Sequence, residues 1–466
     1  MSHSTDISDT LVSDLQTRFD DRCLLPGDET YLEASAIWNG AVERHPAIVV
    51  QCKNTEDVVA TIEAVTEHVI PFSVKGGGHM TTGHALVEDG VVLDLSPMNG
   101  VDIDPGAGTV TIGGGATWDV VNEAALEHEL IPPGIPDDVG VAGFTLGGGM
   151  GVTGRMNGLA CDALRSVEVV TATGEVVTAS ETKNEELFWA IRGGSGNVGI
   201  VTAFEFDCVE ASRECLVANV LYPFDGGAEY LEYFGEVVPG LPEETFPTAA
   251  VMTVPELPDL PKEIHGELAV TGYVMGVGSG ADLKKELEAF ADFGDPHVAA
   301  VYPADYTELY EPFKVPAGQR HHWESFYVDE LDETFIETLL DEAIPKPTPQ
   351  SNIAIYGLGG AINRVAADAT AYPHRDAPFA VHIQGHWVDE SDDDACTEWT
   401  RDLHEQLREF GTGGEYVNNQ TDTNKARVRA SFGENYDRLA DVKAKWDPDD
   451  RLRSTQHVDP GGETGD

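Results

Sequence analysis

Basic side chains are scarce in this chain of 466 residues. It has 28 lysines and arginines against 82 aspartates and glutamates, which gives a formal net charge of −54 at pH 7. Nucleic acids and anionic membranes repel such a protein, so neither is expected as a partner. No run of roughly 18 apolar residues occurs, which excludes a membrane-spanning helix. The first residues lack a basic region followed by an apolar one, so we expect no secretory signal and a cytoplasmic location.

Cysteine is also rare. The six cysteines stand at positions 23, 52, 161, 208, 215 and 396, and no two of them form a Cys-x-x-Cys pair. This spacing lacks the common zinc and redox motifs, and it predicts reduced thiols that are mostly buried. Cys161 in particular is expected in the core.

The acidic excess has two interpretations, a disordered chain or a folded protein covered with carboxylates. Disordered acidic chains have few aromatic residues, whereas this one has 17 Phe, 13 Tyr and 7 Trp and recurring apolar patterns. We therefore expect a folded protein, and its length favours two or more domains. A surface of this charge repels itself unless concentrated salt screens it. The composition thus predicts a halophilic protein from a high-salt cytoplasm, as in haloarchaea.

The first half of the chain mixes strands, helices and glycine-rich loops. Residues 7–22 predict an opening amphipathic helix. Asn54 is expected to cap a helix that runs to about His68. Thr173 and Gly174 separate two β-branched runs, which is typical of a hairpin turn.

The second half, from about residue 213, is richer in prolines and aromatic residues. Strand-like segments alternate there with acidic helical ones, which predicts an α+β arrangement. The expected strands are 268–274 and 352–356, and the expected helices are 281–292, 332–343, 391–410 and a last helical stretch at 424–446.

Four glycine clusters lie between residues 76 and 199. They are 76–78, 113–115, 147–149 with Gly151, and 193–196 with Gly199. None opens a helix inside a βαβ unit with a following ribose-binding acid, so a nicotinamide-binding Rossmann motif is not supported. Backbone N–H groups in such loops can bind a pyrophosphate, although glycines can also mark turns only. A potential nucleophile, His79, ends the first cluster, which suggests a loop that wraps and bonds to a phosphate-bearing cofactor.

Several of these segments resemble known families. Residues 75–79 (KGGGH), 139–149 and 187–199 resemble the FAD-binding domain of the vanillyl-alcohol-oxidase superfamily, also called the PCMH type. Tyr416-Val417-Asn418 and 432–448 are similar to the berberine-bridge-enzyme signature. The resemblance covers roughly residues 38–460. It implies an α+β protein with an FAD domain of two α+β subdomains and a substrate domain whose antiparallel sheet is flanked by helices.

The resemblance also implies domain boundaries. We expect an N-terminal helix and lead-in, the FAD-binding domain, the substrate domain, a C-terminal segment that returns to the FAD domain, and a frayed tail. Their ranges are 1–41, 42–212, 213–415, 416–460 and 461–466.

The resemblance places His79 on the histidine that bonds to the flavin 8α-methyl group. A neutral imidazole is a competent nucleophile near neutral pH, although the ring could instead only hydrogen-bond the loop. Some relatives have a second bond from a cysteine at the position of Pro136, so we expect a single covalent linkage here. The other residues that the resemblance places against FAD are Lys75, Gly76, Gly77, Gly78, Met80, Gly83, Gly140, Gly143, Thr145, Gly147, Gly148, Gly149, Gly196, Gly199, Ile200 and Asn418.

Tyr416 is the first choice for the catalytic base, because it matches the family tyrosine that lies over the flavin. A phenol has a pKa near ~10, so the pKa must be lowered or the proton must leave in concert with hydride loss. The alternative is a tyrosine that packs in the core or stacks on substrate.

Alternation places His382, Gln384 and His386 on one face of a strand, and in the family that face looks into the substrate cavity. We therefore include Gln384 and His382 in the catalytic site. Glutamine cannot usefully take a proton, which leaves that role to Tyr416. The same face of the strand could instead be exposed to solvent. Two imidazoles without a carboxylate make a poor metal site, so no metal is expected.

The resemblance thus implies an FAD-linked oxidase. It would take a hydride from a C–H group of an alcohol, sugar or amine, with O2 as the expected acceptor. A flavin-dependent dehydrogenase with another acceptor, or a flavin protein that binds a ligand without turnover, stays open. The sequence decides neither the substrate nor whether His322 or Trp323 lines its cavity.

Overall fold

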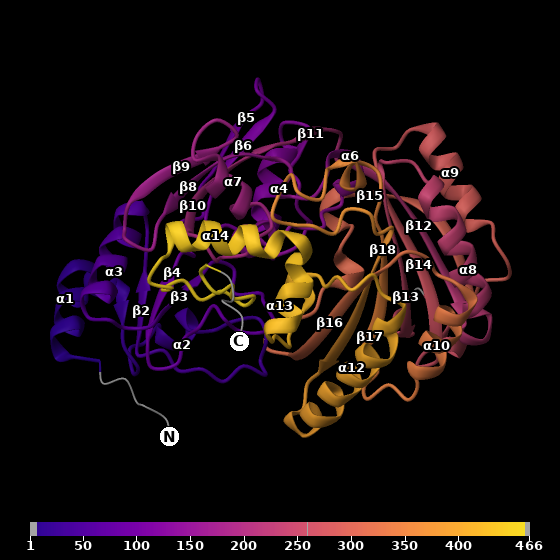
Figure 1. Cartoon of the computed structure of the whole chain (residues 1–466). Helices are drawn as coiled ribbons and strands as arrows, with labels where there is room; N and C mark the ends of the chain where they lie inside the picture. Colours follow the sequence, from indigo (N-terminus) through magenta and orange to yellow (C-terminus); the bar gives the residue numbers. More distant parts are fainter. Residues whose placement is uncertain (1–6, 259, 462–466) are drawn as a thin grey trace.

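Two lobes and a C-terminal segment between them make up the protein. The computed structural model describes residues 7–258 and 260–461, so residues 462–466 of the expected tail lie outside the described part. Figure 1 shows the glycine-rich half in indigo to magenta on one side and a large sheet on the other, with the yellow C-terminal helices between them. Within the described residues, no helix is both long and apolar enough to cross a bilayer.

The first lobe begins with a small sheet that is packed against capped helices. The Asn54 side chain accepts a hydrogen bond from the N–H of Asp57 and so begins helix α3 (Thr55–Glu67), while helix α1 (Asp9–Phe19) packs beside it. β2, β4 and β3 run parallel, so the loop after β3 starts at their carboxyl edge, where open α/β sheets bind ligands. The strands lie in the order β1 (Cys23–Leu24), β2 (Ile48–Gln51), β4 (Val91–Asp94) and β3 (Phe72–Lys75).

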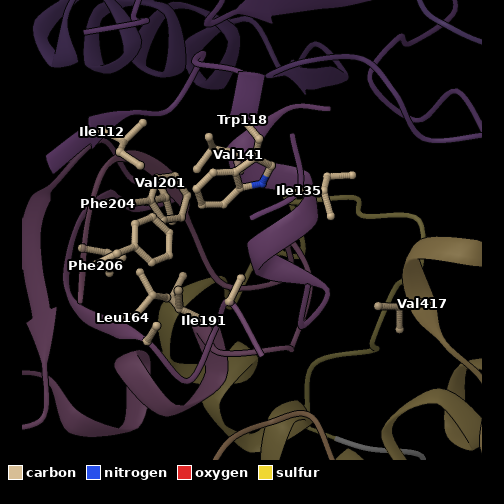
Figure 2. Packing of buried hydrophobic residues seen from close by; sticks show 14 of the residues in the cluster. Ile112, Trp118, Ile135, Val141, Leu164, Ile191, Val201, Phe204, Phe206 and Val417 are labelled. Carbon is tan, nitrogen blue, oxygen red and sulfur yellow. The ribbon is translucent and has the colours of Figure 1, made fainter. Parts of the chain in front are cut away.

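A second, antiparallel sheet completes this lobe. The expected hairpin is confirmed, because Gly174 turns between β8 and β9 with a φ of 84°. Figure 2 shows Trp118, from helix α4 (Trp118–Leu126), packed near Phe204 and Phe206 of β10. The strand order is β5 (Val101–Asp104), β6 (Thr109–Gly113), β10 (Ile200–Asp207), β8 (Leu164–Val170) and β9 (Val176–Ser180).

The second lobe is one antiparallel sheet of seven strands. Helices α8 (Gly227–Val237), α9 (Ala281–Ala291), α10 (Glu333–Glu342) and α12 (Asp393–Leu407) pack their apolar sides on one face of it. The opposite face is turned toward the first lobe (Figure 1). The strand order is β15 (Val298–Asp305), β12 (Glu214–Pro223), β14 (Leu268–Val277), β13 (Thr245–Thr253), β17 (Asn352–Gly357), β18 (Phe379–Trp387) and β16 (Arg320–Val328). The expected α+β class is thus confirmed.

The C-terminal segment differs from the expected single helical stretch. It forms two helices, α13 (Lys425–Phe432) and α14 (Tyr436–Trp446). Gly433 separates them with a φ of 47°, a conformation that ends an α-helix and that glycine adopts at low cost. α14 then packs against α7 (Glu185–Ile191) of the first lobe, which brings the segment back to the glycine loops.

Candidate active site

A large cavity lies between the glycine loops, the free face of the seven-stranded sheet and the C-terminal segment. Its volume is about 1050 Å³. The residues of the expected site that line it are Gly76, Gly77, Gly78, His79, Met80, Gly140, Gly143, Gly196, Gly199, Ile200, Gln384, Tyr416 and Asn418. Segments more than 300 residues apart therefore meet at one site.

Two glycine loops touch each other through their backbones. A Cβ atom on Gly77 would lie 2.5 Å from the Cα of Gly140, and one on Gly140 would lie 2.6 Å from the nitrogen of Gly77. Gly143 also lines the cavity, but a Cβ there would meet nothing within 4 Å and would fill open space. The loops thus form a long cradle with bare backbone, which fits a large cofactor that carries a pyrophosphate.

The other expected cofactor residues lie behind the cavity wall. Lys75 is buried, and its Nζ donates a hydrogen bond to the carbonyl oxygen of Ala34 at 2.8 Å. Gly147 leaves room for Asn418, whose Oδ1 would be 2.0 Å from a Cβ on this residue. These positions shape the loops rather than face the cavity, as do Gly83, Thr145, Gly148 and Gly149.

His79 projects from the first loop and stacks on an indole. Its ring centroid lies 4.2 Å from that of Trp38, with 18° between the planes. Burial lowers the pKa of His79 to about 4, so the imidazole is neutral at neutral pH and keeps a nucleophilic lone pair. Trp38 also lines the cavity. Sequence reasoning missed it, because one tryptophan in a lead-in segment carries no periodic signal.

The loop at Pro136 brings a carboxyl group to the cavity. Ile135 and Asp137, on either side of Pro136, both line it. Burial raises the pKa of Asp137 to about 6, although its Oδ1 accepts a hydrogen bond from the N–H of Asp138. No sequence pattern distinguishes this aspartate from the many other acidic residues.

Tyr416 is buried, with its phenol oxygen between two N–H donors. The Met150 N–H donates to this oxygen at 3.2 Å, and Nδ2 of Asn418 donates at 3.1 Å. Burial raises the pKa of Tyr416 to about 12, and the hydrogen bonds oppose that rise by stabilising the phenolate. The hydroxyl is therefore protonated at neutral pH, with donors that stabilise negative charge on its oxygen.

The polar face of β18 is divided between the cavity and the protein interior. Gln384 and His386 line the cavity, whereas His382 is fully buried beside it. Nδ2 of Asn419 donates to Nδ1 of His382 at 2.5 Å, and the ring stacks on Tyr356 at 4.3 Å. Burial lowers the pKa of His382 to about 3, so this ring is neutral.

On strand β16, Trp323 reaches the cavity and His322 does not. Trp323 pairs with Gln384 across the sheet and lines the cavity, while its neighbour His322 points to the other face. His321, on the cavity side, stacks on Trp38 with centroids 3.7 Å apart and planes 8° apart. Its Nδ1 lies 2.9 Å from Nδ1 of His386. Burial lowers the pKa of His386 to about 4, so neutral imidazoles border this end of the cavity.

On the far face of β16, a group of possible metal ligands is already paired. Ligand atoms of His322, Glu324 and Asp422 lie within 4.8 Å of one another. Arg427 forms an ion pair with Glu324, and Nε of Arg401 lies 2.5 Å from Oδ2 of Asp422. Because arginines already neutralise both carboxylates, we interpret the group as an ion-pair network that joins the C-terminal segment to the sheet.

Comparisons with known proteins agree with this arrangement. The chain matches the FAD binding domain family over residues 46–180 and the family "Berberine and berberine like" over residues 415–459. It is 29% identical over 455 residues to the FAD-linked oxidoreductase YgaK of Bacillus subtilis, covering 96% of this chain and 98% of that one. It is 30% identical over 400 residues to the FAD-linked oxidoreductase fogF of Aspergillus ruber, covering 80% of this chain and 77% of that one.

Solved structures with the same fold include two oxidases. One is 6-hydroxy-D-nicotine oxidase from Arthrobacter nicotinovorans, with a TM-score of 0.82, 25% identity, and coverage of 94% of this chain and 97% of that one. The other is glucooligosaccharide oxidase from Acremonium strictum, whose FAD is described as 6-S-cysteinyl, 8α-N1-histidyl, with a TM-score of 0.85, 23% identity, and coverage of 97% and 100%. The chain therefore belongs to the berberine-bridge-enzyme-like FAD-linked oxidoreductases of the vanillyl-alcohol-oxidase superfamily.

Proposed function

We propose that this FAD-linked oxidoreductase is an oxidase that acts on an alcohol, a sugar or an amine and passes the electrons to O2. Bound FAD would supply the acceptor for a hydride from the carbon next to the hydroxyl or amine. The names of the two oxidases of the same fold, one for a hydroxynicotine and one for an oligosaccharide, support this range of substrates.

We propose that residues 42–212 hold the cofactor and that 213–415 provide the substrate wall, with 416–460 returning to the cofactor. The bare backbone at Gly77, Gly140 and Gly143 supports this division, since it leaves room for a large group against the first lobe. We further propose a single covalent bond through His79. Its neutral ring at the cavity supports that bond, and Pro136 excludes a second one from that position.

We propose that Tyr416 takes the proton that leaves the substrate hydroxyl or amine. The observation that carries this role is the pair of N–H donors on its phenol oxygen, from Met150 and Asn418. The phenol is protonated at rest, so it would take the substrate proton in its phenolate form, after its own proton has passed to solvent in the cavity. The two donors lower the cost of the negative charge on the oxygen during that exchange.

Gln384 and His382 would orient rather than exchange protons. The Gln384 amide faces the cavity and offers both a donor and an acceptor to a substrate hydroxyl. His382 is neutral and accepts a hydrogen bond from Asn419, which also lines the cavity, so it would fix that amide toward the substrate.

The test is Tyr416→Phe, which keeps the ring and removes the hydroxyl. A panel of sugars, alcohols and amines is screened for bleaching of the flavin absorbance under anaerobic conditions in ~3 M salt, where surface charge is screened. We expect the best substrate of the wild type to bleach the variant about 100-fold more slowly, with flavin content unchanged. Tyr310→Phe, which removes a hydroxyl from another cavity tyrosine, is the matched control. Bleaching of Tyr416→Phe at the wild-type rate would show that Tyr416 is not the residue that takes the proton.

The acceptor is tested separately. Formation of H2O2 on addition of substrate in air is expected for an oxidase. Flavin that bleaches but reoxidises only with another acceptor would identify a dehydrogenase, and flavin that no panel member bleaches would favour a binding protein.

We also propose that the protein is halophilic and cytoplasmic. The net charge of −54 supports the first part, since such a surface requires screening. The six cysteines are free and five of them are buried, which suits a reducing compartment.

A further inference from the structure

The lead-in segment 37–40 lies between the two lobes, beside the histidine proposed as the flavin tether. Its Trp38 indole is sandwiched between two imidazoles. His79 of the first lobe lies on one face, with centroids 4.2 Å apart, and His321 of the second lobe is stacked at 3.7 Å. The planes differ by only 18° and 8°, so three rings form one nearly parallel stack.

Trp38 itself is held from three directions. Its Nε1–H donates to the carbonyl oxygen of Val315 at 3.1 Å. Its backbone N–H donates to the oxygen of Gly78 at 3.0 Å, and its own carbonyl accepts from the N–H of Gly318 at 2.9 Å. The plane of the indole is therefore fixed relative to the loop that ends in His79.

The next residue of the segment extends the same connection. Nδ2 of Asn39 donates to the carbonyl oxygens of Thr81 at 2.7 Å and of His321 at 3.0 Å. Its Oδ1 accepts from the N–H of His321 at 2.9 Å. His321 in turn lies 2.9 Å from His386, Nδ1 to Nδ1. Both sides of the stack are thus anchored, one in each lobe.

Besides the Trp38 face, the His79 ring has a hydrogen bond with its own backbone. Stacked rings resist tilting, and their attraction adds to the area that they bury. The rotation of the imidazole about its own bonds is therefore limited by the Trp38 face together with this backbone hydrogen bond.

We propose that Trp38 is a positioning residue that holds the His79 imidazole in the plane needed for bonding to the flavin, with His321 as the support behind the indole. This inference rests on the proposed tether. The bond joins a ring nitrogen of His79 to the 8α carbon of the flavin. That nitrogen and that carbon each lose one hydrogen, and O2 takes the two electrons and two protons to give H2O2. A neutral ring suits this step, because its nitrogen keeps a free lone pair.

The test compares Trp38→Leu, Trp38→Phe and the control Phe313→Leu. Phe313 also lines the cavity, but its ring contacts are with Tyr273 and Tyr310 and, among the described residues, none joins it to Trp38, His79 or His321. Each purified protein is precipitated with acid, and the flavin in the pellet and in the supernatant is measured. The rate of attachment is followed after adding FAD to protein produced without riboflavin.

We expect Trp38→Leu to contain as much total FAD as the wild type but to attach it about 10- to 100-fold more slowly, because misplacement of a reacting group by about 1 Å costs that much. Trp38→Phe keeps a ring and should attach FAD at a rate between the two. Phe313→Leu should match the wild type.

Attachment at the wild-type rate in Trp38→Leu would overturn the inference and leave the tether standing. Release of all FAD from the wild type would overturn both the tether and the inference, while the oxidase activity is judged independently by bleaching. If Trp38→Leu binds no FAD, the test uses Trp38→Phe instead. FAD attachment at the wild-type rate in Trp38→Phe would then overturn the positioning role of Trp38.

Discussion

One buried ion pair between the lobes allows a stability prediction that can be worked out from the structure. Arg375 and Asp162 have side-chain exposures of 1% and 7%. The guanidinium donates to both oxygens of Asp162, at 2.7 and 2.8 Å, and also to Oγ1 of Thr370 at 2.8 Å. In Arg375→Leu the Asp162 carboxylate keeps the N–H of Leu159 at 2.8 Å but loses its cationic partner.

The expected cost follows from that geometry. Removing one member of a buried, hydrogen-bonded pair destabilises a protein by about 3–5 kcal/mol, because a charge stays buried without its partner. For a cooperative transition of a chain this long, that corresponds to a fall in Tm of about 3–5 °C. Concentrated salt screens surface pairs but hardly reaches a buried one, so the loss should be the same in ~1 M and ~3 M salt.

The assay is thermal unfolding followed by circular dichroism, with Arg375→Leu, Asp162→Leu and the double variant compared. The double variant should recover most of the loss, since two apolar side chains leave no buried charge. A single variant within about 1 °C of the wild type, or a double variant as unstable as the sum of both singles, would refute the reasoning.

Three further predictions concern the cavity, acid and salt. Gly77→Ala forces a Cβ to 2.5 Å from a backbone atom, so it should lower the FAD content and lower the stability by about 1–3 kcal/mol. Gly143→Ala lies inside a short helix (Val141–Leu146), so it should lower the FAD affinity while the stability of the apoprotein stays equal or rises by up to about 1 kcal/mol; absorbance ratios and melting curves separate the two variants. The pKa of His382 falls to about 3 in the folded protein. The unfolded chain therefore takes up a proton at this histidine as the pH falls below about 6.5, while the folded protein does not, so the protein loses stability as the pH falls from about 6.5 toward 3. In urea titrations, the free energy of unfolding of His382→Phe should therefore depend less on pH over that window than that of the wild type does. An equal dependence would show that His382 does not cause this loss of stability. The net charge of −54 predicts unfolding on dialysis from ~3 M to ~0.1 M salt, and a circular dichroism spectrum that does not change would exclude the halophilic interpretation.

The glycine loops could be predicted from the sequence because their chemistry is local, and His79 lines the cavity beside them. Only glycine tolerates the backbone contact between Gly77 and Gly140, so runs of glycine mark such loops without any knowledge of the fold. The alternation on β18 likewise follows from strand geometry alone, and Gln384 and His386 do line the cavity.

What the sequence could not provide depends on contacts across long distances in the chain. Trp38 stacks on His321, a residue 283 positions away, and no local sequence pattern predicts a contact between two such distant residues. The choice between His322 and Trp323 needed the pairing of β16 with β18, since either residue could have faced the cavity. The break between α13 and α14 at Gly433 lies inside a pattern that reads as one helix, and the packing of α14 on α7 favours the turn.

The contact between Gly77 and Gly140 also limits how this site can diverge. In most tight contacts, a larger side chain at one position can be accommodated by a smaller one at the other. Here each residue already has the smallest side chain and meets the other's backbone, so no exchange at one position relieves a change at the other. A relative with a side chain at either position must hold its two loops farther apart, and its cofactor cradle must be wider than this one.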